Sequence, residues 1–449
     1  MIRRAYNWVF SMICLLIAPF YFLKLWKRGN WREGFGQRFG KYDSRLKQRL
    51  TNRHVIWMHA VSVGEVNVCT QLIKELEPRI PNLKIVVSTT TTTGMQVLRK
   101  KVPQHIEKIY YPIDRSRYVK RAMAVILPEA FLLIEAEIWP NFLWQIINRR
   151  IPLFLVNARF SEKSFRGYRR YAFLFRKIFE GFSGVGVQRK EDIPQLKQLG
   201  FREDSLCVVG NLKFDASPIS EQRKLDVPGM LKQLGVASNA HVIVAGSTHA
   251  GEEALMAEIY NHLKKEFPDL FLIMVPRHFE RGKEVGGQLQ QKGLRFIYRN
   301  QVTAKTRYAQ DELDCLLVNT TGELKLFYEV ATVIFVGKSM MAKGGQSPIE
   351  PGEFAKAMVF GPHMENFPGI TEAFVKNEAA VQVNDEKELE EALADLLRNP
   401  EKRMRIGKNS ARVVSQNQGA VARTIDMIVR HLKVSGKDMY FPPSADSDN

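Results

Sequence analysis

Short apolar runs alternate with longer amphipathic stretches along most of the chain. Between residues 54 and 210 the runs include "VIWMHAV", "KIVVSTT", "FLLIEAEIW", "PLFLVNA" and "LCVVGN". Apolar runs of this kind, separated by amphipathic helices, are typical of βα units in which helices cover both faces of a parallel sheet. The pattern therefore predicts an α/β fold.

A charged stretch with two prolines interrupts the alternation at residues 215–229, "DASPISEQRKLDVPG", before the pattern restarts with "HVIVAGS" and "FLIMVP". The interruption predicts two doubly wound, Rossmann-like domains at residues 29–215 and 236–435. We place a linker at 216–235 and expect a disordered tail at 436–449. Ligands of such sheets bind beyond the carboxyl ends of the strands, and with two domains we expect them in the cleft between the domains.

The first 28 residues fit neither domain. Residues 5–23, "AYNWVFSMICLLIAPFYFL", contain no charged side chain. As a helix this segment would be about 28 Å long, close to the ~30 Å apolar core of a bilayer. Basic residues are more numerous after the segment than before it, which favours an N-terminal single-pass anchor with both domains on the cytoplasmic side. A signal peptide is the competing interpretation, although no small-residue cleavage site follows. Pro19 leaves open a helix that lies in the interface instead of spanning it.

The net charge indicates an anionic partner. The chain has 66 Lys and Arg against 47 Asp and Glu, a formal charge of +19. Nucleic acid, an acidic membrane surface and phosphorylated ligands would all satisfy this excess. The four scattered cysteines lack the spacing of a metal site and favour a reducing compartment.

Four charged residues stand out near strand ends of the first domain. Glu65 follows the run "VIWMHAV" and opens a helix, where an ordinary first-turn acid would contribute about 0.3–1 kcal/mol. Glu135 and Glu137 end "FLLIEAEIW" and would share one face of a strand. Lys213, in "GNLKFD", is a candidate partner for one of them. A buried structural ion pair and a reaction centre both fit these residues.

Four strand ends of the second domain are followed by residues suited to an anionic ligand. They are "AGSTHAGEE" (245–253), "VPRH" (275–278), "TTGELKLFY" (320–328) and "AKGGQSPIEP" (342–351). Each segment alone is a weak indication of a ligand site, because Ser, Gly and Glu are common at helix starts. The sequence has no P-loop, dinucleotide-binding glycine motif or metal-binding cluster, so we expect a ligand to be held by backbone donors, Arg and Lys.

Taken together and in order, these motifs resemble the 3-deoxy-D-manno-octulosonic acid (Kdo) transferases of lipopolysaccharide synthesis over nearly the whole chain. The segments that carry the resemblance are "HAVSVGE", "IEAEIWPN", "GNLKFD", "GSTHAGEE", "VPRH", "GEL", "VGKSM" and "GGQSPIEP". It implies a GT-B glycosyltransferase that moves Kdo from CMP-Kdo to lipid IVA, a tetraacyl disaccharide bisphosphate, at the cytoplasmic face of the inner membrane. It also implies inversion of the anomeric centre without a metal or cofactor.

The same resemblance assigns roles to residues. Glu65 matches the general base, and Glu135 and Lys213 match the transition-state stabilisers. The positions that match CMP contacts are Pro276, Arg277, Gly322, Glu323, Leu324, Ser347, Pro348, Ile349 and Glu350. Two positions depart from the family pattern: Gln346-Ser347 replace the usual His-Asn, and Lys338 replaces a common Gly.

A segment rich in aromatic and basic residues lies at 159–182, "RFSEKSFRGYRRYAFLFRKIFEGF". Aromatic residues at steps of three to four predict a stripe that faces the core. The basic residues between them predict contact with an anionic membrane surface or with acceptor phosphates.

Two other functions stay open at this point. One is a different GT-B enzyme, such as a nucleotide-sugar transferase or epimerase. The other is a membrane-attached nucleic-acid-binding protein, which the charge permits although no RNA- or DNA-binding motif is present.

Overall fold

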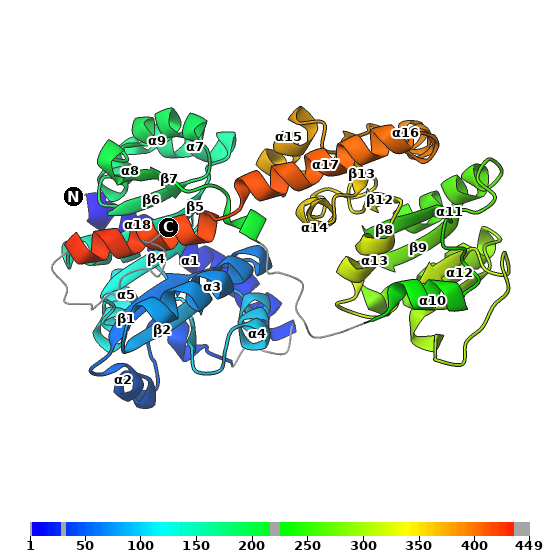
Figure 1. The fold of residues 1–449 in the computed structure, drawn as a ribbon. Coiled ribbons are helices and arrows are strands. Elements are labelled where there is room, and N and C mark those ends of the chain that lie inside the picture. Colours follow the sequence, from blue (N-terminus) through cyan, green and yellow to red (C-terminus); the bar gives the residue numbers. More distant parts are fainter. Residues whose placement is uncertain (1, 28–32, 136, 216–224, 435–449) are drawn as a thin grey trace. The chain divides into compact units, whose positions relative to one another are not determined.

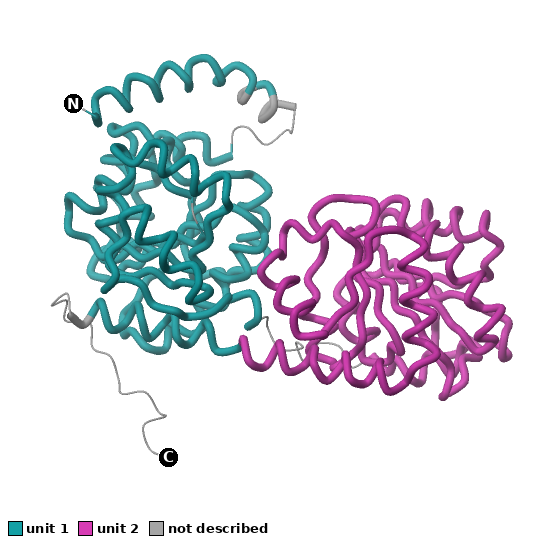
Figure 2. The backbone as a smooth tube through the Cα atoms, turned by 90° about the horizontal axis from the view of Figure 1, so that it is seen from above, with its two compact units in different colours: residues 1–215, 418–449 teal, residues 216–417 magenta. Residues whose placement is uncertain are grey.

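The computed structural model describes residues 2–27, 33–135, 137–215 and 225–434. The chain divides into two compact units (Figures 1 and 2): unit 1 comprises residues 1–215 and 418–449, and unit 2 comprises residues 216–417. The chain therefore leaves the first unit, builds the second and returns to the first.

Unit 1 is built on a seven-stranded sheet of order β3-β2-β1-β4-β5-β6-β7, in which every neighbouring pair is parallel. The strands are β1 (His54–His59), β2 (Leu83–Thr89), β3 (Glu107–Tyr110), β4 (Ala130–Ile134), β5 (Leu153–Ala158), β6 (Gly184–Val187) and β7 (Leu206–Val208). The helices are α1 (Ile2–Lys27), α2 (Ser44–Leu50), α3 (Val63–Leu76), α4 (Thr92–Lys101), α5 (Ser116–Ile126), α6 (Pro140–Asn148), α7 (Glu162–Arg170), α8 (Ala172–Phe179), α9 (Ile193–Leu199) and α18 (Ala420–Val434).

Two apolar layers cover the faces of this sheet, because successive strand residues point to opposite sides. On one face Trp57 lies edge-on against Phe131 and Phe142, with ring centroids 5.7 and 4.9 Å apart. On the other face Ile56 and Met58 belong to a layer that α3 and α18 complete. The buried, parallel sheet confirms the predicted α/β class.

Unit 2 repeats the plan with a second seven-stranded parallel sheet of order β10-β11-β9-β8-β12-β13-β14. Its strands are β8 (Val242–Thr248), β9 (Phe271–Pro276), β10 (Phe296–Tyr298), β11 (Cys315–Leu317), β12 (Val333–Val336), β13 (Ala357–Phe360) and β14 (Val381–Gln382). Its helices are α10 (Val227–Gln233), α11 (Glu252–Leu263), α12 (Gly282–Gln291), α13 (Leu324–Val330), α14 (Ile349–Glu353), α15 (Pro368–Lys376), α16 (Glu386–Arg398) and α17 (Pro400–Asn417).

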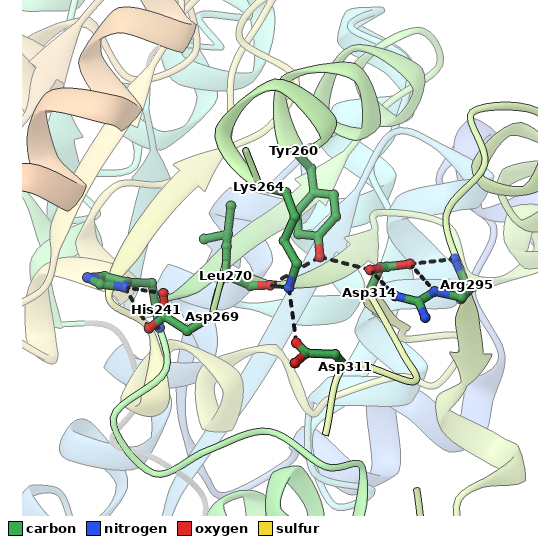
Figure 3. A network of polar contacts seen from close by, with 8 residues as sticks. All are labelled: His241, Tyr260, Lys264, Asp269, Leu270, Arg295, Asp311 and Asp314. Carbon is green, nitrogen blue, oxygen red and sulfur yellow. Dashed lines mark hydrogen bonds and ion pairs between the residues drawn. The ribbon is translucent and has the colours of Figure 1, made fainter. Parts of the chain in front are cut away.

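A polar network ties together the amino ends of the strands in unit 2 (Figure 3). Asp314 accepts hydrogen bonds from the Arg295 guanidinium at 2.8 and 2.9 Å and from the Tyr260 hydroxyl at 3.2 Å. Tyr260 and Lys264 also donate to the carbonyl oxygen of Leu270, at 3.1 and 2.9 Å. Burial alone would raise the pKa of Asp314, but the hydrogen bonds from Arg295 hold it below its usual value. The network joins the starts of β9 and β11, at the edge opposite the strand ends where ligands of such sheets bind.

Two helices belong to a different part of the fold from the one that the sequence pattern predicts. Helix α18 belongs to unit 1, whereas the sequence pattern predicts a second domain that extends to residue 435, and α10 of unit 2 lies within the predicted linker. The Asp215 carboxylate caps α18, accepting from the backbone N–H groups of Gly419 at 2.7 Å and Val421 at 2.5 Å. Residues 216–224 and the predicted tail lie outside the described residues.

Helix α1 docks its first turns on unit 1 and lies along the outside of that unit (Figure 2). The Tyr6 hydroxyl donates to Asp114 at 2.8 Å, and the Asn7 and Asn141 side-chain amides exchange two hydrogen bonds at 3.2 and 3.0 Å. No helix of the described residues is long and apolar enough to cross a bilayer, so the structure does not bear out the predicted spanning anchor.

Candidate functional site

Glu65 lies at the carboxyl end of β1, in the first turn of α3. Its Oε2 accepts the backbone N–H of Val61 at 2.7 Å, while the Ser62 hydroxyl accepts the N–H of Glu65 at 3.2 Å. This reciprocal arrangement stabilises the helix start, as the simpler interpretation of Glu65 required. The two interpretations are therefore compatible: Glu65 stabilises the helix and is also placed at the strand edge.

The electrostatics of Glu65 favour a proton acceptor. Burial raises the pKa of this carboxyl group above its usual value, the hydrogen bonds from Val61 and Ser62 oppose the shift, and the charge of Glu135 adds to it. The hydrogen bonds at this helix start lower the carboxyl pKa, but desolvation outweighs them. A raised pKa brings a carboxylate closer to the range in which a general base works at neutral pH.

Glu135 and Lys213 form the ion pair that the sequence suggested. Strand β4 ends at Ile134, and Glu135 adopts a left-handed backbone conformation with φ of 58°. Its Oε1 lies 3.3 Å from Lys213 Nζ and accepts a hydrogen bond from the Asn157 amide at 3.4 Å. The turn at Glu135 directs this carboxylate toward the β5 side of β4.

Glu137 points elsewhere, so the predicted shared face of the two carboxylates is wrong. Its Oε2 contacts His59 Nε2 at 2.8 Å, on the β1 side of β4. The physical reason is the left-handed turn at Glu135, which ends the strand before the alternation of side chains can continue. His59 lies within the apolar run "VIWMHAV", and the sequence pattern predicts no role for it. A histidine at an inward position of such a strand was the one signal for its role.

The carboxyl edge of unit 2 carries all the positions that we expected to bind CMP. Pro276 ends β9, and the backbone N–H of the exposed Arg277 donates to the carbonyl oxygen of Thr248 at 3.0 Å. The rings of His249 and His278 lie 5.8 Å apart beside this turn. Burial lowers the pKa of His249, and the charges of Lys338 and His278 add to the decrease.

The segment Gly322-Glu323-Leu324 presents backbone to this edge, since the side chain of Glu323 turns inward. Glu323 is 5% exposed, and its carboxylate accepts the Thr320 hydroxyl at 2.5 Å and lies 3.2 Å from Arg299 Nε. Gly322 has φ of 83°, and α13 begins at Leu324. A ligand here would therefore meet main-chain groups and not the Glu323 carboxylate.

A strained loop follows β12 and leads to the remaining expected contacts. Lys338, at a position where the family commonly has Gly, has φ of 57°, and Gly344 and Gly345 also have positive φ. The departure in sequence thus falls on a left-handed residue, which disfavours any side chain with a Cβ. The loop ends at Ser347, whose hydroxyl accepts the N–H of Ile349 at 3.4 Å as α14 begins. Pro348 and Ile349 are buried, while Glu350 in the first turn of α14 is partly exposed.

The sequence missed the residue that holds this loop. Glu252 is 0% exposed and accepts four backbone N–H groups, from His249, Lys338, Ser339 and Met340, at 2.9, 2.7, 2.8 and 3.0 Å. Strands β11, β9, β8 and β12 are consecutive in the sheet. The turns that follow them therefore form one continuous edge, with Glu252 at the junction of β8 and β12.

The segment at 159–182 places its aromatic residues as predicted. Phe165, Phe179 and Phe182 are buried in the core of unit 1, and Tyr168 and Phe175 pack against it. The basic residues between them are exposed: Arg166, Arg169, Arg170, Arg176 and Lys177. Helices α7 and α8 thus combine a core-facing aromatic stripe with a basic outer face.

Comparisons with known proteins show which sequences this chain is similar to. Residues 33–216 match the family described as 3-deoxy-D-manno-octulosonic-acid transferase (kdotransferase). The 3-deoxy-D-manno-octulosonic acid transferase of Haemophilus influenzae is 30% identical over 426 residues, covering 94% of this chain and 97% of the relative. The protein of the same description from Rickettsia bellii is 28% identical over 436 residues, covering 94% and 99%.

A solved structure extends the comparison to the fold. The UDP-GlcNAc 2-epimerase from Neisseria meningitidis bound to UDP-GlcNAc has a TM-score of 0.57 at 14% identity, and the match covers 84% of this chain and 100% of that one. At this identity the likeness concerns the fold alone. It places the chain among GT-B-like proteins with two Rossmann-like domains.

Proposed function

Because the chain belongs to the 3-deoxy-D-manno-octulosonic acid (Kdo) transferases, glycosyltransferases of lipopolysaccharide synthesis, we propose that it transfers Kdo from CMP-Kdo to a hydroxyl group of lipid IVA. The observation that carries the proposal is the environment of Glu65. A buried carboxyl group with a raised pKa stands at a strand edge beside the Lys213–Glu135 ion pair. Transfer to a hydroxyl group requires such a base.

In the proposed reaction the acceptor hydroxyl oxygen attacks the anomeric carbon of Kdo as the bond to the CMP phosphate breaks. Glu65 takes the hydroxyl proton, and CMP leaves as the anion. Attack from the face opposite the leaving group inverts the anomeric centre. No step of this displacement calls on a bound metal for the proton transfer, since the Glu65 carboxylate accepts the proton.

Lys213 and Glu135 stabilise the charges that develop during transfer. The Kdo carboxylate and the departing phosphate are both anionic, so a fixed ammonium group lowers the energy of the transition state. Glu135, 3.3 Å from Lys213 Nζ, holds that ammonium group in place. The pair is partly exposed, at 25% for the Lys213 side chain and 34% for that of Glu135, which leaves it accessible to a substrate.

The donor nucleotide binds along the carboxyl edge of unit 2. Arg277 is exposed there and offers a guanidinium to the phosphate. The backbone of Gly322, Glu323 and Leu324 and the segment from Ser347 to Glu350 line the same edge. The basic face of α7 and α8 and the exposed apolar side chains of α1 fit a membrane-bound acceptor.

Helix α1 lies on the membrane surface in this proposal. Four of its large apolar side chains are more than two-thirds exposed: Trp8 at 69%, Leu15 at 75%, Leu16 at 70% and Phe20 at 75%. Contact with the acyl boundary of an anionic inner membrane would bury them, and basic residues near that surface each add about 1 kcal/mol. Sedimentation with anionic vesicles should weaken when Leu15 and Leu16 are changed to Asp.

The test of function is a transfer assay. Purified protein is incubated with CMP-Kdo and lipid IVA, and the product is weighed by mass spectrometry. Glu65→Gln should lower turnover by 10²- to 10⁴-fold, as loss of a base typically does. Glu75→Gln, on the exposed face of the same helix, is the matched control and should retain activity. Turnover with UDP-sugars instead of CMP-Kdo would assign the chain to a different GT-B reaction.

A further inference from the structure

His59 is a fully buried histidine that the proposed roles leave unused. Its side chain is 0% exposed at the carboxyl end of β1. Nδ1 lies 3.1 Å from the carbonyl oxygen of Ser88 and 2.9 Å from its hydroxyl oxygen, and Nε2 lies 2.8 Å from Glu137 Oε2. The ring also stacks on Tyr111 with centroids 4.0 Å apart. Both nitrogens are therefore engaged, and one engages an acid at the candidate site.

The surroundings of Nδ1 determine where a proton sits. The carbonyl oxygen of Ser88 can only accept a hydrogen bond. The Ser88 hydroxyl accepts from Trp57 Nε1 at 2.8 Å and has the carbonyl oxygen of Met58 at 3.3 Å as an acceptor for its own hydrogen. The carbonyl oxygen must accept and the hydroxyl oxygen is able to, so we infer that Nδ1 carries a proton.

The contact between Nε2 and Glu137 then contains one further proton. If Nε2 carries it, an imidazolium faces a carboxylate; if Glu137 carries it, a neutral imidazole accepts from a carboxylic acid. The pair has no net charge in either form. Each form also avoids placing an unprotonated Nε2 against an ionised carboxylate, which would repel each other. The pair is neutral wherever that proton lies.

We propose that His59 is a positioning residue for Kdo transfer, which holds Glu137 at the reaction centre and forms with it a neutral pair that shares one proton. This inference rests on the proposed function. Its consequence is a division of charge: Lys213 offsets Glu135, His59 offsets Glu137, and Glu65 is left as the ionisable acid of this edge. Donor and acceptor are both anionic, so three uncompensated carboxylates here would oppose their binding.

Several ionisable groups surround Glu65 and Glu137 and affect the net charge at this edge of the sheet. The charges of Glu135 and His59 act on the Glu65 carboxyl group, and burial followed by the charge of Glu65 raises the pKa of the Cys69 thiol. A charge on His59 lowers the pKa of Glu65, so that loss of the imidazole acts on the base directly.

Glu137 is in turn faced by three side chains. They are His59, Tyr111 and Tyr168; burial raises the pKa values of both tyrosines, and the charge of Glu137 adds to the increase. The charge of Asp114 also raises the pKa of Tyr111, although burial contributes more.

The inference predicts opposite behaviour for two single variants. His59→Asn removes the imidazole and leaves Glu137 to ionise alone, which adds a negative charge. The acid limb of the kcat/KM profile should then move up by about one pH unit, and the KM for CMP-Kdo should rise roughly tenfold. Glu137→Gln exchanges one neutral pair for another, so its acid limb should stay within a few tenths of a unit of wild type while kcat falls.

The double variant separates charge from structure. Combining His59→Asn with Glu137→Gln removes the added negative charge, so the acid limb should return toward wild type. If His59 only supported the fold, the double variant would be at least as impaired as His59→Asn. His54→Asn is the matched control, because His54 forms a His–Glu pair with Glu129, Nδ1 to Oε2 at 3.1 Å, at the other end of the same strand. Its pH profile should be that of wild type.

Proton placement can be read without activity. Nitrogen-15 NMR of labelled histidine in the full chain, assigned by comparison with His59→Asn, should give a protonated Nδ1 from pH 6 to pH 8. A bare Nδ1 would overturn the inference, as would an acid limb in His59→Asn that matches wild type. Absence of Kdo transfer by the wild-type protein would instead refute the proposed function, and the NMR result would still decide the state of the pair.

Discussion

The loop between β12 and α14 should depend on one buried carboxylate. Glu252 accepts the N–H groups of Lys338, Ser339 and Met340 within the loop and that of His249 in the turn after β8. No cationic side chain of the described residues pairs with it within ion-pair distance. The loop contains residues in left-handed conformations at Lys338, Gly344 and Gly345. The two glycines adopt this conformation readily, but Lys338 does not, so the loop relies on Glu252 to hold the turn at Lys338.

Glu252→Gln removes one of the two carboxylate oxygen acceptors and keeps the size and shape of the side chain. Oε1 accepts from Ser339 and Met340, and Oε2 accepts from His249 and Lys338. A glutamine offers one carbonyl oxygen for two of these donors, and its NH₂ group faces the other two. Each buried donor left unsatisfied costs about 1–3 kcal/mol, so the free energy of unfolding of unit 2 should fall by about 2–6 kcal/mol.

The two units can be followed separately in a urea titration. All six tryptophans lie between residues 8 and 144, in unit 1, so their fluorescence reports that unit alone. Far-UV circular dichroism reports both. Glu252→Gln should unfold part of the dichroism signal at lower urea and leave the fluorescence midpoint unchanged. Glu258→Gln, on the exposed side of the same helix opposite Lys292, should alter neither signal. Wild-type dichroism in Glu252→Gln would show that the loop is held by other contacts.

Three single residues give further tests: Arg277 and Lys338 at the carboxyl edge of the sheet in unit 2, and Asp114, which accepts a hydrogen bond from Tyr6 of α1. Arg277→Ala should raise the KM for CMP-Kdo by 10- to 100-fold with a smaller effect on kcat, because a charge-assisted contact to the phosphate is lost; an unchanged KM would place the donor elsewhere. Lys338→Gly should raise the free energy of unfolding of unit 2 by up to ~1 kcal/mol in the same urea titration, since a left-handed φ of 57° disfavours a Cβ. Burial raises the pKa of Asp114 to about 7, against hydrogen bonds from Asn141, Tyr6 and Phe142 that lower it. A carboxyl group with a raised pKa in the folded state stabilises the fold at low pH, and this contribution is lost as the pH rises through about 7. The free energy of unfolding of unit 1, followed by fluorescence, should therefore fall by up to ~4 kcal/mol between pH 4 and pH 7. Asp114→Asn should make this pH dependence shallower.

The sheets were predictable because their signal is local. A central parallel strand is buried on both faces, so β1 and β8 appear in the sequence as continuous apolar runs whatever surrounds them. An ion pair between Lys213 and one of the two carboxylates was also foreseeable, since a carboxylate at the end of an apolar strand needs a partner and Lys213 lies near another strand end of the same domain. What the sequence could not give was the direction of each carboxylate. The letters "IEAEIW" continue the alternation of a strand, whereas the chain turns at Glu135, where Lys213 and Asn157 come from distant segments.

Helix α18 illustrates a second limit of local patterns. Its apolar side, including Ile425, Ile428 and Leu432, would suit either sheet, and nothing within residues 420–434 specifies which. The choice is made by Asp215, about 200 residues earlier in the chain, whose carboxylate caps the helix in unit 1. His59 and Glu252 belong to the same category, because their partners lie on other strands and loops. Buried polar residues with remote partners are thus the part of the site that only the fold could reveal.

The N-terminal segment shows how one apolar run can serve two surfaces. Tyr6 and Asn7 face unit 1, while Trp8, Leu15 and Leu16 are exposed. Tyr6 donates to Asp114, and the same carboxylate accepts the backbone N–H groups of Asn141 and Phe142 at the start of α6. Helix α6 follows directly after the segment that carries Glu135 and Glu137. The helix that we propose to lie on the membrane therefore shares a buried acid with the element that ends the candidate site, and its docking contributes to the structure of that site as well as to attachment.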